Sequence, residues 1–98
     1  MTKTPRRKID QSWLNQQFAQ DGWEKRLASY TKVEIYNSLT PREHGQVEGT
    51  LTIGHDYYDA ENALVATIFH YRKPDGNFGA SGKPCPKGLL IDGIWCHT

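Results

Sequence analysis

Residues 62–72 read NALVATIFHYR, and this stretch decides how the chain folds. It is rich in β-branched and aromatic residues, which favour a strand. Because side chains alternate along a strand, Leu64 and Ile68 point to one face and Val65 and Phe69 to the other. A strand that is apolar on both faces is normally central in its sheet and covered on both sides. We therefore predict a central strand, with Leu64 and Ile68 buried under a helix.

The residues that follow this strand have the composition of a tight turn. Residues 73–77 read KPDGN. Proline sets the backbone angle of the first central position, aspartate suits the second, and glycine accepts the left-handed conformation that follows. We therefore predict a hairpin in which Phe78 lies opposite Arg72.

The rest of the chain contains shorter patterns for two helices and further strands. Asp10 or Ser12 can cap a helix, and Gly22 suits the left-handed position at its end. Apolar residues from Trp23 onward repeat with helical spacing and predict a second helical stretch. Further strands are predicted at residues 32–36, 47–53 and 94–98, a helical turn at residues 40–43, a chain reversal at residues 92–93, and loops at residues 54–61 and 79–88.

Length and element order together predict the architecture. A chain of 98 residues normally forms one domain. We predict a flexible basic arm at residues 1–8 and a single α+β domain at residues 9–98. In this fold, an N-terminal helix or a bent helix pair packs on a small, mostly antiparallel sheet of about four to five strands.

One helical layer shields only one face of such a sheet, so the other face needs its own cover. Val65, Phe69 and Tyr71 form an apolar stripe on that second face, and a stripe of this kind is unusual on the surface of a monomer. Either residues 85–98 fold over it, or a second copy of the chain covers it in a symmetric homodimer, which is our preferred prediction.

Composition and charge narrow the functional classes. The 12 basic and 11 acidic side chains leave a net charge of +1, so the overall charge does not indicate a nucleic-acid partner. The two cysteines and the lack of an apolar leader predict a cytoplasmic protein with reduced thiols. We expect no membrane association, because no apolar run approaches the roughly 20 residues that a membrane span needs.

Two apparent ligand motifs do not meet the requirements of their chemistry. Residues 79–84 read GASGKP, but Pro84 stands where a phosphate loop needs serine or threonine, and it disfavours the helical conformation at Lys83. Cys96 and His97 are adjacent on a predicted strand and point to opposite faces, so they do not share one ion. We predict neither a metal site nor a cofactor.

The leading interpretation is a binding or regulatory protein that acts through protein–protein contacts, such as an inhibitor carried by a phage or mobile element. Residues 33–61 contain six acidic side chains and one basic side chain, which suits a basic partner surface. The candidate contact residues are the apolar Val65, Phe69, Tyr71 and Phe78 and the acidic Glu34, Glu43, Glu48, Asp56 and Asp59.

The alternative is a metal-independent RNase-like toxin or a small nucleic-acid-binding protein. RNA cleavage of this kind needs a general base, a general acid and a cation near the phosphate. His70 and Arg72 share one face of the predicted central strand, His97 or His55 offers a second imidazole, and Lys83 adds positive charge. Because no catalytic motif frames these residues, the leading interpretation is a protein without enzymatic activity.

Overall fold

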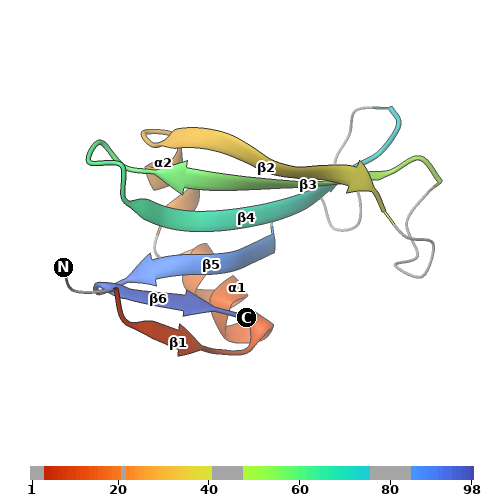
Figure 1. Cartoon of the computed structure of the whole chain (residues 1–98). Coiled ribbons are helices and arrows are strands. Elements are labelled where there is room, and N and C mark those ends of the chain that lie inside the picture. Colours follow the sequence, from red (N-terminus) through yellow and green to blue (C-terminus); the bar gives the residue numbers. More distant parts are fainter. Residues whose placement is uncertain (1–3, 21, 41–47, 76–84) are drawn as a thin grey trace.

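The computed structural model describes residues 4–20, 22–40, 48–75 and 85–98. In this part of the chain, two short helices pack on one face of a six-stranded mixed sheet (Figure 1). The predicted α+β class is confirmed, but the sheet has six strands instead of about four to five. The elements in chain order are β1 (Arg6–Lys8), α1 (Gln11–Gln20), α2 (Trp23–Leu27), β2 (Thr31–Leu39), β3 (Leu51–Tyr58), β4 (Leu64–Arg72), β5 (Cys85–Ile91) and β6 (Ile94–His97).

The helices begin and end where local chemistry predicts. The Asp10 Oδ1 atom accepts a hydrogen bond from the Trp13 backbone N–H at 3.1 Å, so Asp10 caps α1. Gly22 adopts φ 64° between the helices, a left-handed conformation that carries no steric penalty for glycine. Both predictions are confirmed, and the chain turns there into α2.

The core lies between the two helices and one face of the sheet, here called the helix face. It is formed by Leu14, Phe18, Trp23 and Leu27 from the helices and by Ala66, Ile68, Leu89 and Cys96 from the sheet. Ile68 is only 3% exposed, so its predicted burial is confirmed. Leu64, in contrast, is partly exposed and lies outside the core, and its predicted burial is wrong. The register shift between Tyr57 and Tyr58 leaves Val65 as an extra residue in β4 and breaks the alternation that would have aligned Leu64 with Ala66.

The strand order is β1-β6-β5-β4-β3-β2, so β4 is an interior strand, as predicted. Neighbouring strands are antiparallel except for β1 and β6, which are parallel. Cys85 pairs with Phe69 and Leu89 with Ala66, which places β5 beside β4. The prediction that residues 85–98 fold over the second sheet face is therefore wrong. They extend the sheet sideways instead (Figure 1), because their backbone groups pair with the edge of β4.

Three local predictions also differ from the structure. Residues 55–58, predicted as loop, form the second half of β3, which begins at Leu51; residue 47, the predicted start of this strand, lies outside the described residues. Residues 85–88, also predicted as loop, begin β5 despite Pro86 and Gly88. The strand tolerates Gly88 because the Trp95 ring occupies the space that a side chain would take there.

The third difference concerns the basic arm. Arg6–Lys8 form strand β1, which lies along β6 at the end of the sheet. Two backbone hydrogen bonds flank it, from the Trp95 N–H to the Pro5 carbonyl and from the Ile9 N–H to the His97 carbonyl, both at 2.8 Å. This part of the predicted arm is therefore ordered by pairing with residues almost ninety positions away in sequence.

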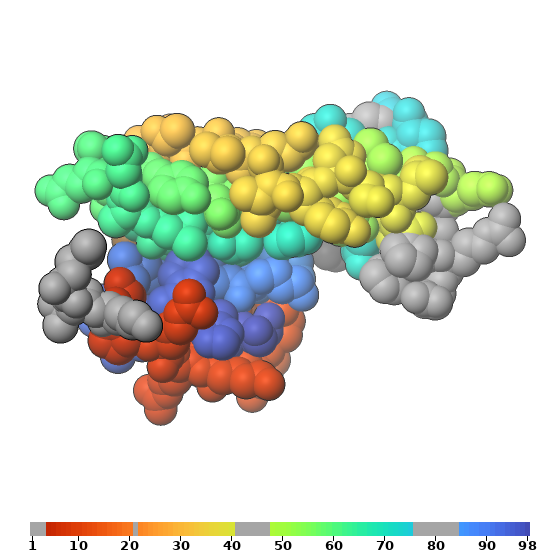
Figure 2. Space-filling view, viewed as in Figure 1, coloured from red at the N-terminus to blue at the C-terminus, as the bar shows by residue number. Residues whose placement is uncertain are grey.

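The helices cover only part of the helix face. The α1 helix packs on β5, where the Gln11 Nε2 atom donates a hydrogen bond to the Pro86 carbonyl at 2.6 Å. Strands β2, β3 and β4 run past the helices, and Figure 2 shows β2 and β3 extending beyond the part of the molecule built from β1, β5 and β6. No helix in the described ranges is long and apolar enough to cross a membrane. Most of the predicted helical turn at residues 40–43 and the end of the predicted hairpin lie outside the described residues.

Candidate functional site

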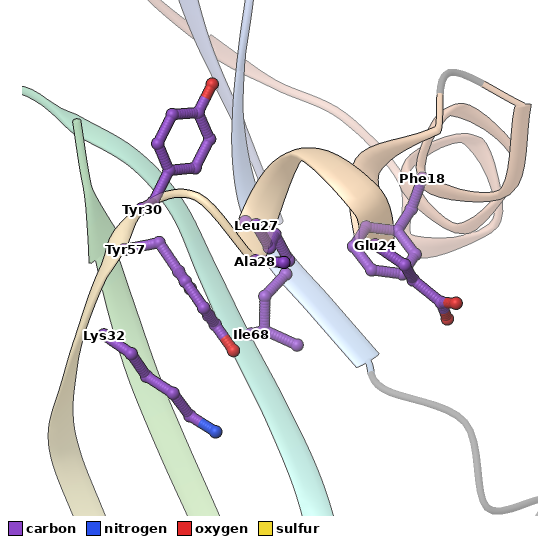
Figure 3. A pocket seen from close by; sticks show the side chains of 8 residues that line it. All are labelled: Phe18, Glu24, Leu27, Ala28, Tyr30, Lys32, Tyr57 and Ile68. Atoms are coloured by element: carbon purple, nitrogen blue, oxygen red, sulfur yellow. The ribbon is translucent and has the colours of Figure 1, made fainter.

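A hollow of about 370 Å³ lies on the helix face, between the two helices and strands β2, β3 and β4 (Figure 3). Its floor is apolar and includes Phe18, Leu27 and Ile68. Two phenol rings, those of Tyr30 and Tyr57, also line it. The hollow therefore combines an apolar floor with flat aromatic walls.

Lys32 adds a cation to the same hollow. It pairs with Tyr57 across β2 and β3, and Figure 3 shows both side chains extending away from Tyr30. Glu24 lies on the other side of the hollow, so the acidic and basic groups that line it are separated. Burial raises the pKa of the Tyr57 phenol above its ordinary value of 10.0, so this hydroxyl, like that of an exposed tyrosine, is protonated at neutral pH.

Two imidazoles lie next to this hollow along the same sheet face. His55 pairs with Ile68, and His70 pairs with Ile53, so the two histidines are diagonal neighbours on β3 and β4. Their rings are almost parallel, with an interplanar angle of 13° and centroids 5.6 Å apart. The centroid of the His55 ring is also 6.5 Å from that of the Tyr57 ring, which connects the histidine pair to the hollow.

Burial, and then the charges around the pair, favour neutral imidazoles. Burial lowers the pKa of His55 below 6.5; Lys32 and Arg72 lower it further, and Glu34 opposes them. Burial likewise lowers the pKa of His70, with further lowering by His55, Lys32 and Arg72. Two cations therefore act on both rings, and both rings are mainly neutral at neutral pH.

The structure brings together only part of the predicted RNase set. His70 and Arg72 do share the helix face of β4, next to Leu51 and Ile53 of β3. His97 lies on β6, where it pairs with Gly88 of β5. Its side chain is on the opposite face from that of the buried Cys96, so His97 is not the partner of His70. Lys83 lies outside the described residues. The imidazole beside His70 is His55, the other of the two residues that the sequence offered for this position.

The sheet face opposite the helices, here called the open face, carries part of the predicted apolar stripe. Val65 is 5% exposed and belongs to the internal packing of the chain. Phe69 and Tyr71 are partly exposed. The Phe69 ring covers Gly54, where the methyl group of an alanine would be only 2.7 Å from it, and its centroid lies 5.9 Å from that of the Tyr36 ring. Phe78 lies outside the described residues.

The predicted acidic residues do not form one surface. Asp56 accepts a hydrogen bond from the Thr67 hydroxyl at 2.6 Å on the open face, whereas Glu34 pairs with His55 on the helix face. Asp59 is occupied within its loop, because its Oδ1 atom accepts hydrogen bonds from two backbone N–H groups, those of Glu61 and Ala63. Glu48 is exposed before β3. Glu43 lies outside the described residues.

The outer edge of β2 is a surface that the sequence interpretation did not identify. Within the described chain, β3 is the only strand that pairs with β2, and all nine β2 residues are exposed. The large exposed hydrophobic side chains found in the described ranges all belong to this strand: Val33 (44%), Ile35 (47%), Tyr36 (47%) and Leu39 (67%). The apolar residues at positions 33 and 35 were the available signal, but sequence alone does not show which strand lies at an edge.

Among the residues that the structure describes, no group of three or more His, Cys, Asp or Glu side chains is arranged to hold a metal ion.

Comparison with known proteins adds no further constraint on this site. No protein-family model matches the chain, and no curated protein or solved structure matches it either.

Proposed function

We propose that this protein is a small binding protein that recognises another protein by adding one of its strands to the outer edge of β2. The observation that carries the proposal is the exposure of β2 along its whole length, including its four large apolar side chains. A surface of this kind is rare on soluble proteins unless something binds it.

Strand addition would use both the backbone and the side chains of β2. An edge strand directs alternate N–H and C=O groups away from its sheet, and an added strand pairs with them. The same addition would shield Val33, Ile35 and Leu39 from water. Full burial of a large apolar side chain is worth about 1.5–3 kcal/mol before the costs of association, and these side chains, already partly shielded, would each contribute correspondingly less.

The apolar surface continues from this edge onto the open face. The Tyr36 ring neighbours the Phe69 ring, which covers Gly54, so an aromatic pair from β2 and β4 adjoins the edge. Partners that add a strand normally gain specificity from such neighbouring side chains. Phe69 and Tyr71 therefore remain in the proposed contact surface, and a regulatory or inhibitory role follows if the bound segment is withdrawn from another interaction.

The test is an affinity capture from the native host with a matched pair of variants. Ile35→Lys adds a charge to the edge, and Gln16→Lys adds the same charge to an exposed position of α1. We expect a protein that is captured by wild-type and Gln16→Lys chains and lost with Ile35→Lys. Amide hydrogen exchange of β2 should then slow in the purified complex.

Two outcomes would count against this function. If every captured protein binds Ile35→Lys as well as wild type, the β2 edge is not the contact surface. If the chain instead forms a dimer that Ile35→Lys dissociates, the edge binds a second copy and the partner is the protein itself. A far-ultraviolet circular dichroism spectrum identical to wild type establishes that each variant is folded.

A further inference from the structure

The hollow and the histidine pair are neighbours on the helix face, and Lys32 and Tyr57 lie between them. Lys32 lines the hollow, and its charge also acts on both His55 and His70. Tyr57 makes the same connection, since it lines the hollow and its ring neighbours that of His55. A ligand that fills the hollow would therefore reach the imidazoles.

The two halves of this surface have complementary chemistry. The hollow is within the usual size range of small-molecule sites, roughly 300–1,000 Å³, and its apolar floor and Tyr30 and Tyr57 rings suit a flat ring. The adjoining half contains the Lys32 ammonium and two imidazoles, with Glu34 paired with His55 as its carboxylate, and the Arg72 guanidinium lies further along β4, opposite Leu51. Several nitrogen donors on one side suit an anion with several oxygen atoms, such as phosphate, more than a single carboxylate.

We propose that this joined surface binds a nucleotide, with the base in the hollow and the phosphate beside Lys32, His55 and His70. Glu24, on the side of the hollow away from Lys32, is placed to accept a hydrogen bond from an amino group of the base. The site lies on the helix face and uses the Lys32 side chain, not the outer backbone edge of β2, so it is a second binding function. Its ligand is either a free nucleotide or one nucleotide unit of single-stranded RNA.

The experiment is a titration of the full chain followed by NMR, with cytidine 5′-monophosphate as the probe. Cytidine and inorganic phosphate are titrated separately, because each offers only half of the ligand. We expect the nucleotide to shift the imidazole signals of His55 and His70 and the ring signals of Tyr57. Cytidine and phosphate alone should each bind at least about tenfold more weakly.

A matched pair of lysine variants tests the central residue. Lys32→Ala should weaken nucleotide binding about tenfold, which is typical for the loss of one hydrogen bond to a charged group. Lys25→Ala removes an exposed lysine of α2 that does not line the hollow, and it should bind like wild type. Both positions are exposed, so both variants should fold.

The remaining results identify the ligand source or overturn the proposal. Tighter binding of a short single-stranded RNA with the same signal changes would assign RNA as the source, and no RNA binding would assign the free nucleotide. Unchanged His55, His70 and Tyr57 signals at millimolar nucleotide would refute the site. Equal affinity for nucleotide and phosphate, or for wild type and Lys32→Ala, would refute it as well.

Discussion

The two edges of the sheet differ in length, charge and exposure. The β1 edge has three residues, and all of them are basic. The β2 edge has nine residues, of which only Lys32 and Glu34 are charged. Short, charged edge strands prevent other chains from adding to a sheet, whereas long apolar ones permit it. The comparison shows that one edge is short and entirely basic, whereas the other is long, mainly uncharged and interrupted by a single register shift between Glu34 and Tyr36.

The strands next to the two edges differ in how far the helices cover them. The β5 strand, two positions from the β1 edge, is backed by α1, and Leu89 and Cys96 are buried beneath the helices. Strands β2, β3 and β4 extend past the helices (Figure 1), so the side chains at their far ends depend less on helix packing. The histidine pair lies on β3 and β4. The proposed nucleotide site is therefore close to the proposed protein-binding edge of β2, but it lies on the helix face of the sheet.

The largest expected effect comes from making the same isoleucine truncation in the core and at the edge. Ile68→Ala removes a side chain that is 3% exposed and should lower the free energy of unfolding by about 2–5 kcal/mol. Ile35→Ala at the 47% exposed edge position should change it by less than about 0.5 kcal/mol. Urea denaturation followed by circular dichroism measures both. Similar losses in the two variants would show that β2 is packed against something in the folded chain.

A second test compares two glycines that are each covered by an aromatic ring, Gly88 on β5 and Gly54 on β3. In Gly88→Ala the new methyl group meets the Trp95 ring, and in Gly54→Ala it meets the Phe69 ring at 2.7 Å. Each substitution should cost about 1–3 kcal/mol, because the ring must move from its place on the open face. Denaturant midpoints measure the cost. A neutral Gly54→Ala alongside a costly Gly88→Ala would show that the Phe69 ring moves freely on the side of β2.

A third test concerns the pH dependence of stability contributed by the histidine pair. The pKa values of His55 and His70 are lowered in the folded chain, so the unfolded chain binds more protons as the pH falls below 6.5. Their contribution to the free energy of unfolding is complete above about pH 6.5, and it decreases as the pH falls toward the lowered pKa values of the folded chain. We expect a lower urea midpoint at pH 5.5 than at pH 7.5. The difference should shrink in His55→Gln/His70→Gln, and an equally large difference in that variant would exclude the pair as its cause.

The smallest expected effect on stability comes from charging the exposed edge itself. Leu39 is 67% exposed, so Leu39→Lys should change the free energy of unfolding by less than about 0.5 kcal/mol. It should nevertheless reduce self-association at high protein concentration, because a lysine on an edge strand opposes strand addition. Light scattering over a concentration series measures this effect. Unchanged scattering, for a wild type that does associate, would show that association uses another surface.

The sequence by itself determined the features that depend on neighbouring residues. The Asp10 cap, the left-handed Gly22 and the chain reversal at Asp92 and Gly93, with φ angles of 50° and 76°, all follow from local backbone and side-chain chemistry. The interior position of β4 follows from its apolar pattern. These signals act within a few residues, so they can be read without knowing the fold.

Only the tertiary structure decided the strand partners and the sites that depend on them. The β1 strand pairs with β6 from the other end of the chain, and β5 accommodates Gly88 because Trp95 covers it. His55 meets His70, and β2 becomes an edge, through the register of strands that are remote in sequence. Strand pairing of this kind depends on contacts across the whole sheet and only weakly on local propensity, so no pattern within one segment specifies it.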